Sequence, residues 1–301
     1  MKFNKKQLEL FFYTADERHI IYKRKEIEKL PRDQWTNDPI FKEFRFCNVY
    51  RKLDKVTQRI IKKVIEPYEK IKKIDELYKG IFISRFFSKI ETIEFLVNNF
   101  DICNSKEYPE IVTALKELSK TQTLMTGSFM LSPLKLNKKV YPKLLTPFYH
   151  IQLLSSKDEH FGDNWYKAMP TIQDIKEYLE ELPCNGGFMS YEYATDLTYS
   201  KLYYPEKPED YYTYCPIHQG SLIGMNRLLG NEPTKNKIPD VENLTLELLE
   251  LWNNHVKKTN ILELDENNSL SMREVEHWLC EFDKYSREYN KETKRIKRRY
   301  T

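Results

Sequence analysis

The spacing of apolar and polar residues predicts a chain built mainly from amphipathic helices. In the clearest example, apolar residues at positions 172, 175, 179 and 182 follow Pro170 and Thr171, a typical helix start. A second helix is expected after a turn at residues 182–190 and ends near Asp196. An acidic, tyrosine-rich loop at 205–214 then precedes a third helix that starts at Gly220 and Ser221. The predicted fold class is all-α.

A second helical pattern follows Asp38 and Pro39, which favour a helix start. Its apolar stripe is Phe46, Val49, Tyr50, Leu53, Val56 and Ile60, and its polar face is Arg45, Asn48, Arg51 and Asp54. This face fits an internal arginine–aspartate network, and it equally fits the wall of a nucleotide pocket, because arginine pairs with phosphates and base edges. Before it, we expect a short arm and then a basic helix from His19 to Leu30.

Composition narrows the class of protein. With 301 residues the chain can form one large domain or two lobes, and 8 glycines against 31% charged residues favour helices. The net charge of +4 permits a nucleic-acid face without requiring one. We expect a cytoplasmic monomer with no membrane span, because the chain shows no long apolar run and no signal peptide.

No metal and no cofactor are expected from local motifs. The five cysteines show no CxxC spacing, and the six histidines form no HxH or HxxxH pair. A G-x-x-x-x-G-K-[ST] phosphate loop does not occur in the sequence, so we do not expect a kinase of that type.

The glycine pair at 186 and 187 is the first candidate for DNA contact. A tight turn there leaves the first amides of the next helix able to bind an anion such as a DNA phosphate, through Asn185, Gly186 and Gly187. Gly220 and Ser221 offer a similar helix start. A helix cap and connector without a ligand is the simpler interpretation of the glycine pair.

The run from Leu182 through Pro183 and Gly186 resembles the hairpin of helix-hairpin-helix DNA glycosylases. That resemblance implies a two-lobed helical domain whose hairpin grips double-stranded DNA while a carboxylate attacks an extruded nucleotide. Cys184 replaces the usual first glycine. Phe188 stands where bifunctional enzymes carry a lysine, which implies a monofunctional enzyme. The candidate catalytic residues are Asp196, which a nearby arginine could instead bind, and Asp210, which could be a solvated loop acid.

A second resemblance covers residues 33–287. It rests on Asn37-Asp38-Pro39, on Arg45 to Asp54, on Arg85-Phe86, on residues 126–130, and on Glu276-His277 with Cys280-Glu281-Phe282-Asp283-Lys284-Tyr285. These stretches resemble the helical domain found with phage 5-hydroxymethyluracil DNA kinases and the α-glutamyl/putrescinyl thymine pyrophosphorylases. We accordingly expect an arm and basic helix at 1–32, the glycosylase-like domain at 33–287 and a basic tail at 288–301. The tail is expected to be a phosphate-contacting helix or a disordered arm.

The resemblances imply a pocket for a modified pyrimidine. Its expected residues are Arg45, Asn48, Tyr50, Arg51, Arg85, Phe86, Tyr191, Glu276, Glu281 and Lys284. Glu281 and Lys284 could instead form a surface pair.

Three functions remain open. The first is excision of a hypermodified pyrimidine, such as glucosylated hydroxymethylcytosine, from phage DNA in anti-phage defence. The second is a transferase that replaces pyrophosphate on 5-hydroxymethyluracil with an amine or amino acid, and the third is a non-catalytic binder of modified DNA. We favour excision, because the chain carries no fused kinase and an altered hairpin.

Overall fold

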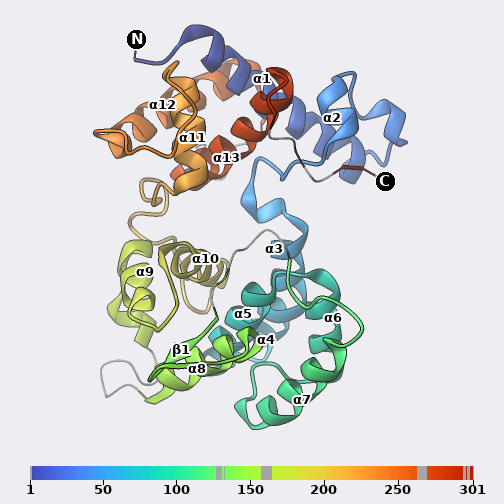
Figure 1. Cartoon of the computed structure of the whole chain (residues 1–301), viewed down its shortest axis with the longest axis vertical. Helices are drawn as coiled ribbons and strands as arrows, with labels where there is room; N and C mark the ends of the chain where they lie inside the picture. Colours follow the sequence, from blue (N-terminus) through green and yellow to red (C-terminus); the bar gives the residue numbers. More distant parts are fainter. Residues whose placement is uncertain are drawn as a thin grey trace. The chain divides into compact units, whose positions relative to one another are not determined.

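A computed structural model describes residues 2–126, 131, 133–156, 165–262, 270–293, 296, 299 and 300. These residues are mainly helical and contain one two-stranded antiparallel sheet, so the all-α prediction is confirmed. The chain divides into two compact units (Figure 1). Unit 1 comprises residues 1–54 and 212–301, and unit 2 comprises residues 55–211. The division expected from the sequence, at residues 32/33 and 287/288, stays a prediction. In the described part of the chain, no helix combines the length and apolarity that a membrane span needs.

Unit 1 joins the two ends of the chain. Its α-helices are α1 (Lys5–Tyr22), α2 (Pro39–Glu43), α11 (Gln219–Leu228), α12 (Val241–Thr259) and α13 (Met272–Tyr289). Its shorter turns are η1 (Lys23–Ile27, π), η2 (Arg32–Gln34, 3-10) and η3 (Arg51–Leu53, 3-10). The N-terminal α1 lies against the C-terminal α13 (Figure 1). Phe11 of α1 forms the centre of the contact, with its ring 5.0 Å from Trp252 and 5.5 Å from Phe282.

The first helix starts much earlier than expected. Instead of an arm followed by a helix from His19 to Leu30, α1 begins at Lys5, where the side chain of Asn4 caps Gln7 N–H. One face of this helix is buried, through Leu8, Phe11 and Ala15. The charged residues Lys5, Lys6 and Glu9 around Leu8 mask this pattern in the sequence.

The prediction of a single helix after Asp38 is also wrong. Asp38 does cap α2, but α2 ends at Glu43, and Phe44 is extended and pairs with Arg299. Phe44 and Phe46 are both buried, in a cluster with Ile21, Tyr285 and Ile296. A strand-like alternation therefore replaces helical spacing here, because residues of the C-terminal tail pack onto it. Ile296 packs in this cluster and the N–H of Tyr300 donates to Glu43 O, so these two described tail residues contact unit 1.

Unit 2 is built around one buried helix, α5. The α-helices of the unit are α3 (Lys55–Ile60), α4 (Glu66–Lys70), α5 (Ile74–Phe87), α6 (Ile90–Asn99), α7 (Tyr108–Leu118), α8 (Thr146–Ser156), α9 (Ile172–Glu180) and α10 (Gly187–Leu197). Its other elements are η4 (Ile61–Ile65, π), η5 (Ser105–Glu107), η6 (Lys143–Leu145), η7 (Trp165–Ala168), β1 (Lys135–Leu136) and β2 (Lys139–Val140). Nearly every residue of α5 from Leu77 on is buried, and Phe82 stacks on Tyr193 of α10 with ring centroids 4.2 Å apart.

The helix–turn–helix–loop–helix order expected for residues 170–230 is confirmed by α9, α10 and α11. A capping box between Thr171 and Asp174 starts α9. In the predicted motif at 126–130, residues 127–130 lie outside the described part of the chain.

Candidate functional site

The turn between α9 and α10 forms a tight hairpin in unit 2. Cys184 has φ of +62°, the left-handed conformation that favours glycine. Asn185 is buried, and its side-chain amide donates to Leu179 O at 2.8 Å and to Ser190 Oγ at 3.0 Å. The Asn185 side chain therefore fixes the turn. Gly186 is the N-cap of α10, and Gly187 is the first residue of that helix.

Arg85 and Asp196 form a fully buried ion pair in unit 2. Arg85 Nε donates to Asp196 Oδ2 at 2.6 Å, and Nη2 donates to Asp196 Oδ1 at 2.7 Å. The same guanidinium donates to Thr57 Oγ1 at 2.9 Å and lies 3.8 Å from Glu192 Oε2. Asp196 has no exposed surface, and both of its carboxylate oxygens accept from arginine. This geometry joins α10 to α5.

Phe86 and Tyr191 are also buried in unit 2. The ring of Phe86 lies edge-on to Phe87 at 5.6 Å. These two predicted pocket residues thus belong to the packed interior of the unit, together with Arg85.

Asp210 is a partly accessible carboxylate at the start of α9. Its Oδ1 accepts from Ile172 N at 2.7 Å and its Oδ2 from Gln173 N at 3.0 Å, so it binds the start of α9. The side chain is half-buried. Burial raises the pKa of Asp210, although the two backbone N–H groups act in the opposite direction. A carboxylate with a raised pKa is a stronger base than an ordinary aspartate.

In unit 1, two predicted motifs more than 200 residues apart lie side by side. The backbone N–H of Cys47 donates to Glu281 Oε2 at 3.1 Å, and Glu281 also pairs with Lys284. His277 Nε2 lies 3.1 Å from Asn48 O and 3.5 Å from Asp54 Oδ2. The segment from Cys47 to Asp54 therefore runs along one face of α13.

Charges on this face of α13 influence one another. Glu281 is buried, and burial alone would raise its pKa. Lys284, His277 and the Cys47 N–H outweigh burial and lower the pKa of Glu281 to about 2. The expectation of a Glu281–Lys284 surface pair is wrong, because the glutamate is only 2% exposed.

Glu276 differs from Glu281 in its surroundings. Burial raises the pKa of Glu276, although His277, the Ser221 hydroxyl and Arg51 lower it. Ser221 Oγ lies 3.0 Å from Glu276 Oε1. The Ser221 side chain is fully buried, so it points toward α13. Helix α13 thus carries one acid with a raised pKa and one with a lowered pKa.

Glycines bring α11 close to α13. A Cβ on Gly220 would lie 2.7 Å from Cys280 Sγ, and a Cβ on Gly224 would collide with the backbone carbonyl of Leu279. Two predicted DNA-contact residues therefore face α13. Gly220 does so with its α-carbon, and Ser221 does so with its side chain.

The remaining predicted pocket residues lie along residues 45–51. Asn48 is buried, and its side chain accepts from Arg18 Nη2 at 2.5 Å and donates to Leu53 O at 2.7 Å. Arg45 is exposed, with its guanidinium 5.9 Å from the Tyr300 ring. Tyr50 packs edge-on against His19 at 5.4 Å, and Arg51 opens η3.

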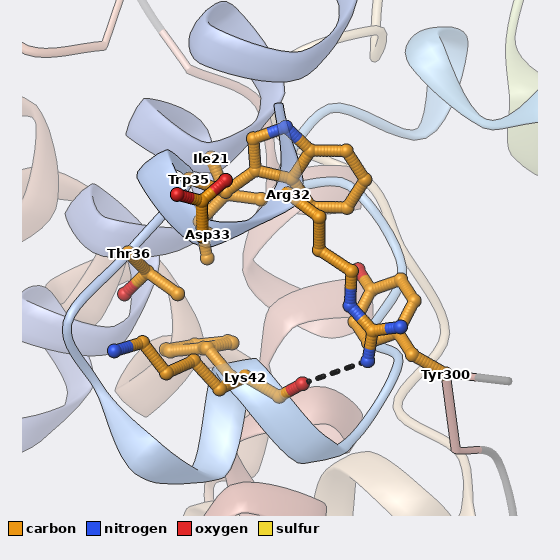
Figure 2. A pocket seen from close by; sticks show the side chains of 8 residues that line it. Ile21, Arg32, Asp33, Trp35, Thr36, Lys42 and Tyr300 are labelled. Carbon is orange, nitrogen blue, oxygen red and sulfur yellow. Dashed lines mark hydrogen bonds between the residues drawn. The ribbon is translucent and has the colours of Figure 1, made fainter. Parts of the chain in front are cut away.

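A cavity of about 520 Å³ lies beside α2 in unit 1. Figure 2 shows Trp35 and Tyr300 on either side of Arg32, whose guanidinium lies 4.7 Å from the Tyr300 ring and donates to Lys42 O. The lining residues are Ile21, Arg32, Asp33, Trp35, Thr36, Phe41, Lys42 and Tyr300. The lining thus combines the aromatic rings of Trp35 and Tyr300 with two cations, Arg32 and Lys42. Such a lining suits a planar anion. Sequence reasoning assigned none of these residues a role in binding.

Sequence reasoning also missed His277 and Cys47 as members of the α13 cluster. His277 stands between the two predicted acids, at 276 and 281, so its position in the motif was the available signal. For Cys47 the sequence holds no signal, because its neighbour Glu281 is 234 residues away.

Comparison with known proteins gives one family. The family model described as "5-hmdU DNA kinase, helical domain" matches residues 5–295. The "5-hmdU DNA kinase" of Bacillus phage SP10 is 24% identical over 300 residues, which cover 93% of this chain and 45% of that protein. The chain thus spans about half the length of this relative. No solved structure matches the chain.

Proposed function

Because the chain belongs to the family of the 5-hmdU DNA kinase helical domain, we propose that it acts on a modified pyrimidine in DNA. We propose further that it is a monofunctional DNA glycosylase, which hydrolyses the bond between that base and its sugar and leaves an abasic site. The name of the phage relative supports a modified pyrimidine as the target. The missing phosphate loop favours a reaction other than phosphoryl transfer for these residues.

The observation that carries the glycosylase proposal is the position of Asp210 at the start of α9. Breaking the base–sugar bond develops an oxocarbenium-like charge, which a carboxylate stabilises while it activates water. Asp210 is half-buried and has a raised pKa, and its backbone hydrogen bonds fix its orientation. Asp196 differs from it, because Asp196 is fully buried and both of its oxygens accept hydrogen bonds from Arg85 in the interior. We therefore assign the catalytic role to Asp210 and a structural role to Asp196.

The α9–α10 hairpin supports DNA binding in the same unit. The turn holds the first residues of α10 in place through Asn185, and the N-terminus of a helix attracts phosphate. Gly186 has no atom within 4 Å of the place where a Cβ would stand, so a DNA backbone can approach it closely.

The decisive experiment incubates the full chain with phage DNAs that carry different modified pyrimidines. Alkali treatment and a gel then detect abasic sites, and mass spectrometry identifies the released base. Asp210→Asn should abolish cleavage while the protein stays folded. Asp174→Asn is the matched control, because it removes the capping-box carboxylate at the same helix start and leaves Asp210 in place.

Two other outcomes would replace the proposal. Intact strands with a new nucleoside mass, formed only with an added amine and a pyrophosphorylated base, would indicate the transferase. Binding of modified DNA without any change in it would indicate a non-catalytic reader.

A further inference from the structure

Cys47, Asp54 and His277 bring three metal-binding side chains together in unit 1. The thiol sulfur, a carboxylate oxygen and a ring nitrogen all lie within 4.8 Å of one another, and each side chain is half-buried. Within the described ranges, no other group of three cysteine, histidine or acidic side chains meets this condition. Two of these residues come from the 47–54 segment and one from α13.

The backbone of Asn48 contacts two of the three side chains. Its N–H donates to Asp54 Oδ1 at 2.9 Å and orients that carboxylate. Its carbonyl oxygen lies 3.1 Å from His277 Nε2, and this nitrogen would exchange that contact for the metal ion. The other Asp54 oxygen, Oδ2, is 3.5 Å from the imidazole nitrogen. That separation is close to the roughly 3.3 Å between two ligand atoms bound tetrahedrally at 2.0–2.1 Å from zinc. A small movement would thus suffice for both side chains to bind one ion.

The kinds of donor narrow the choice of metal. A thiolate and an imidazole suit zinc and similar transition metals, whereas magnesium and calcium prefer oxygen ligands throughout. Three protein ligands leave a fourth position for water or a substrate oxygen, as in catalytic rather than structural zinc sites.

We propose that Cys47, Asp54 and His277 bind one zinc ion with an open coordination position. The site does not depend on the glycosylase reaction, and its test measures metal rather than activity.

The test titrates the metal-free full chain with Co²⁺ as a spectroscopic substitute for Zn²⁺. One equivalent should produce a thiolate-to-cobalt charge-transfer band together with the visible bands of a tetrahedral site, and Zn²⁺ should displace it. Cys47→Ser should remove the charge-transfer band. His277→Gln and Asp54→Asn should weaken binding by at least about tenfold, since changes even in outer-shell partners cost that much.

Matched controls use residues of the same types elsewhere. Cys184→Ser changes an exposed thiol in unit 2, and His255→Gln changes the histidine paired with Asp16, so both should bind Co²⁺ like the wild type. A band that survives Cys47→Ser, or that disappears in Cys184→Ser, would overturn the proposal.

A second measurement covers the case in which Cys47→Ser fails to fold. One equivalent of Zn²⁺ should raise the Tm of the wild-type chain, and a chelator should reverse the increase. No Co²⁺ band and no Tm shift in the wild type would also overturn the proposal.

Discussion

Two buried carboxylates in this protein, Asp196 and Glu281, each pair with a basic side chain. Asp196 and Arg85 share two hydrogen bonds in unit 2, and Glu281 pairs with Lys284 and the Cys47 N–H in unit 1. A buried ion pair adds little net stability, but the loss of one member leaves an uncompensated charge in the interior. A substitution at these positions therefore tests folding first and chemistry second.

Asp196→Asn should destabilise unit 2 by about 3–5 kcal/mol, because it removes the charged partner that accepts two hydrogen bonds from the buried Arg85 guanidinium. Chemical unfolding measures this loss. The triple variant Arg85→Met, Asp196→Leu and Glu192→Gln should recover much of the stability, since it removes all three buried charges. An Asp196→Asn variant with wild-type stability and no activity would instead return the catalytic role to Asp196.

Glu281 should make the stability of unit 1 depend on acid pH. Its folded pKa of about 2 lies below the ordinary value of 4.5, so ionised Glu281 stabilises the fold above about pH 4.5. This contribution, on the order of 3 kcal/mol, is lost as pH falls through 4.5 toward 2. Unfolding free energies between pH 2 and 7 should show a shallower acid slope in Glu281→Gln. An unchanged slope would contradict this role of Glu281.

At the scale of elements, local signals predicted some helices and long-range packing decided the others. Helices α9, α10 and α11 follow from apolar spacing, the helix start at Pro170 and Thr171, and the glycines of the turns, all within a few residues. The segment from Phe44 to Leu53 did not follow, because Phe46 and Tyr285 share a cluster that only the folded chain creates. For the same reason the sequence suggested the Glu281–Lys284 pair but not its burial.

The contact between α11 and α13 depends on the small size of Gly224. Gly224→Ala should destabilise unit 1 by about 1–3 kcal/mol or more, because its Cβ would meet the rigid Leu279 carbonyl. Gly220→Ala should cost less, since the Cys280 side chain that it meets can rotate. Thermal unfolding of both variants should give this order, and the reverse order would disprove the close approach.

The α9–α10 hairpin offers a test of phosphate binding through a single N–H. Gly187→Pro removes that N–H at the first position of α10, where proline fits a helix. Gly187→Ala is the control, because it adds a Cβ against the same Glu180 side chain but keeps the N–H. Only the proline variant should weaken DNA binding, measured by fluorescence anisotropy at several salt concentrations. Equal binding by the two variants would remove this N–H from the interface.

At the scale of the whole molecule, unit 2 is one continuous insertion into unit 1. The chain leaves unit 1 after Asp54 and returns at Tyr212. A fragment of residues 55–211 should therefore fold alone and unfold cooperatively, as circular dichroism would show. In a fragment of residues 1–211, only unit 2 should fold, because the fragment lacks the unit 1 helices α11, α12 and α13. Non-cooperative melting of the 55–211 fragment would show that unit 2 needs unit 1.

Unit 1 consists of two separate segments of the chain, so the ribosome synthesises its two parts at different times. Helix α1 is synthesised before all of unit 2, yet the partners of Phe11, Trp252 and Phe282, are synthesised only after unit 2. All of unit 2 has left the exit tunnel by then and can fold by itself. While unit 2 is being synthesised, the apolar face of α1 is therefore exposed on a nascent chain, where a chaperone can bind it.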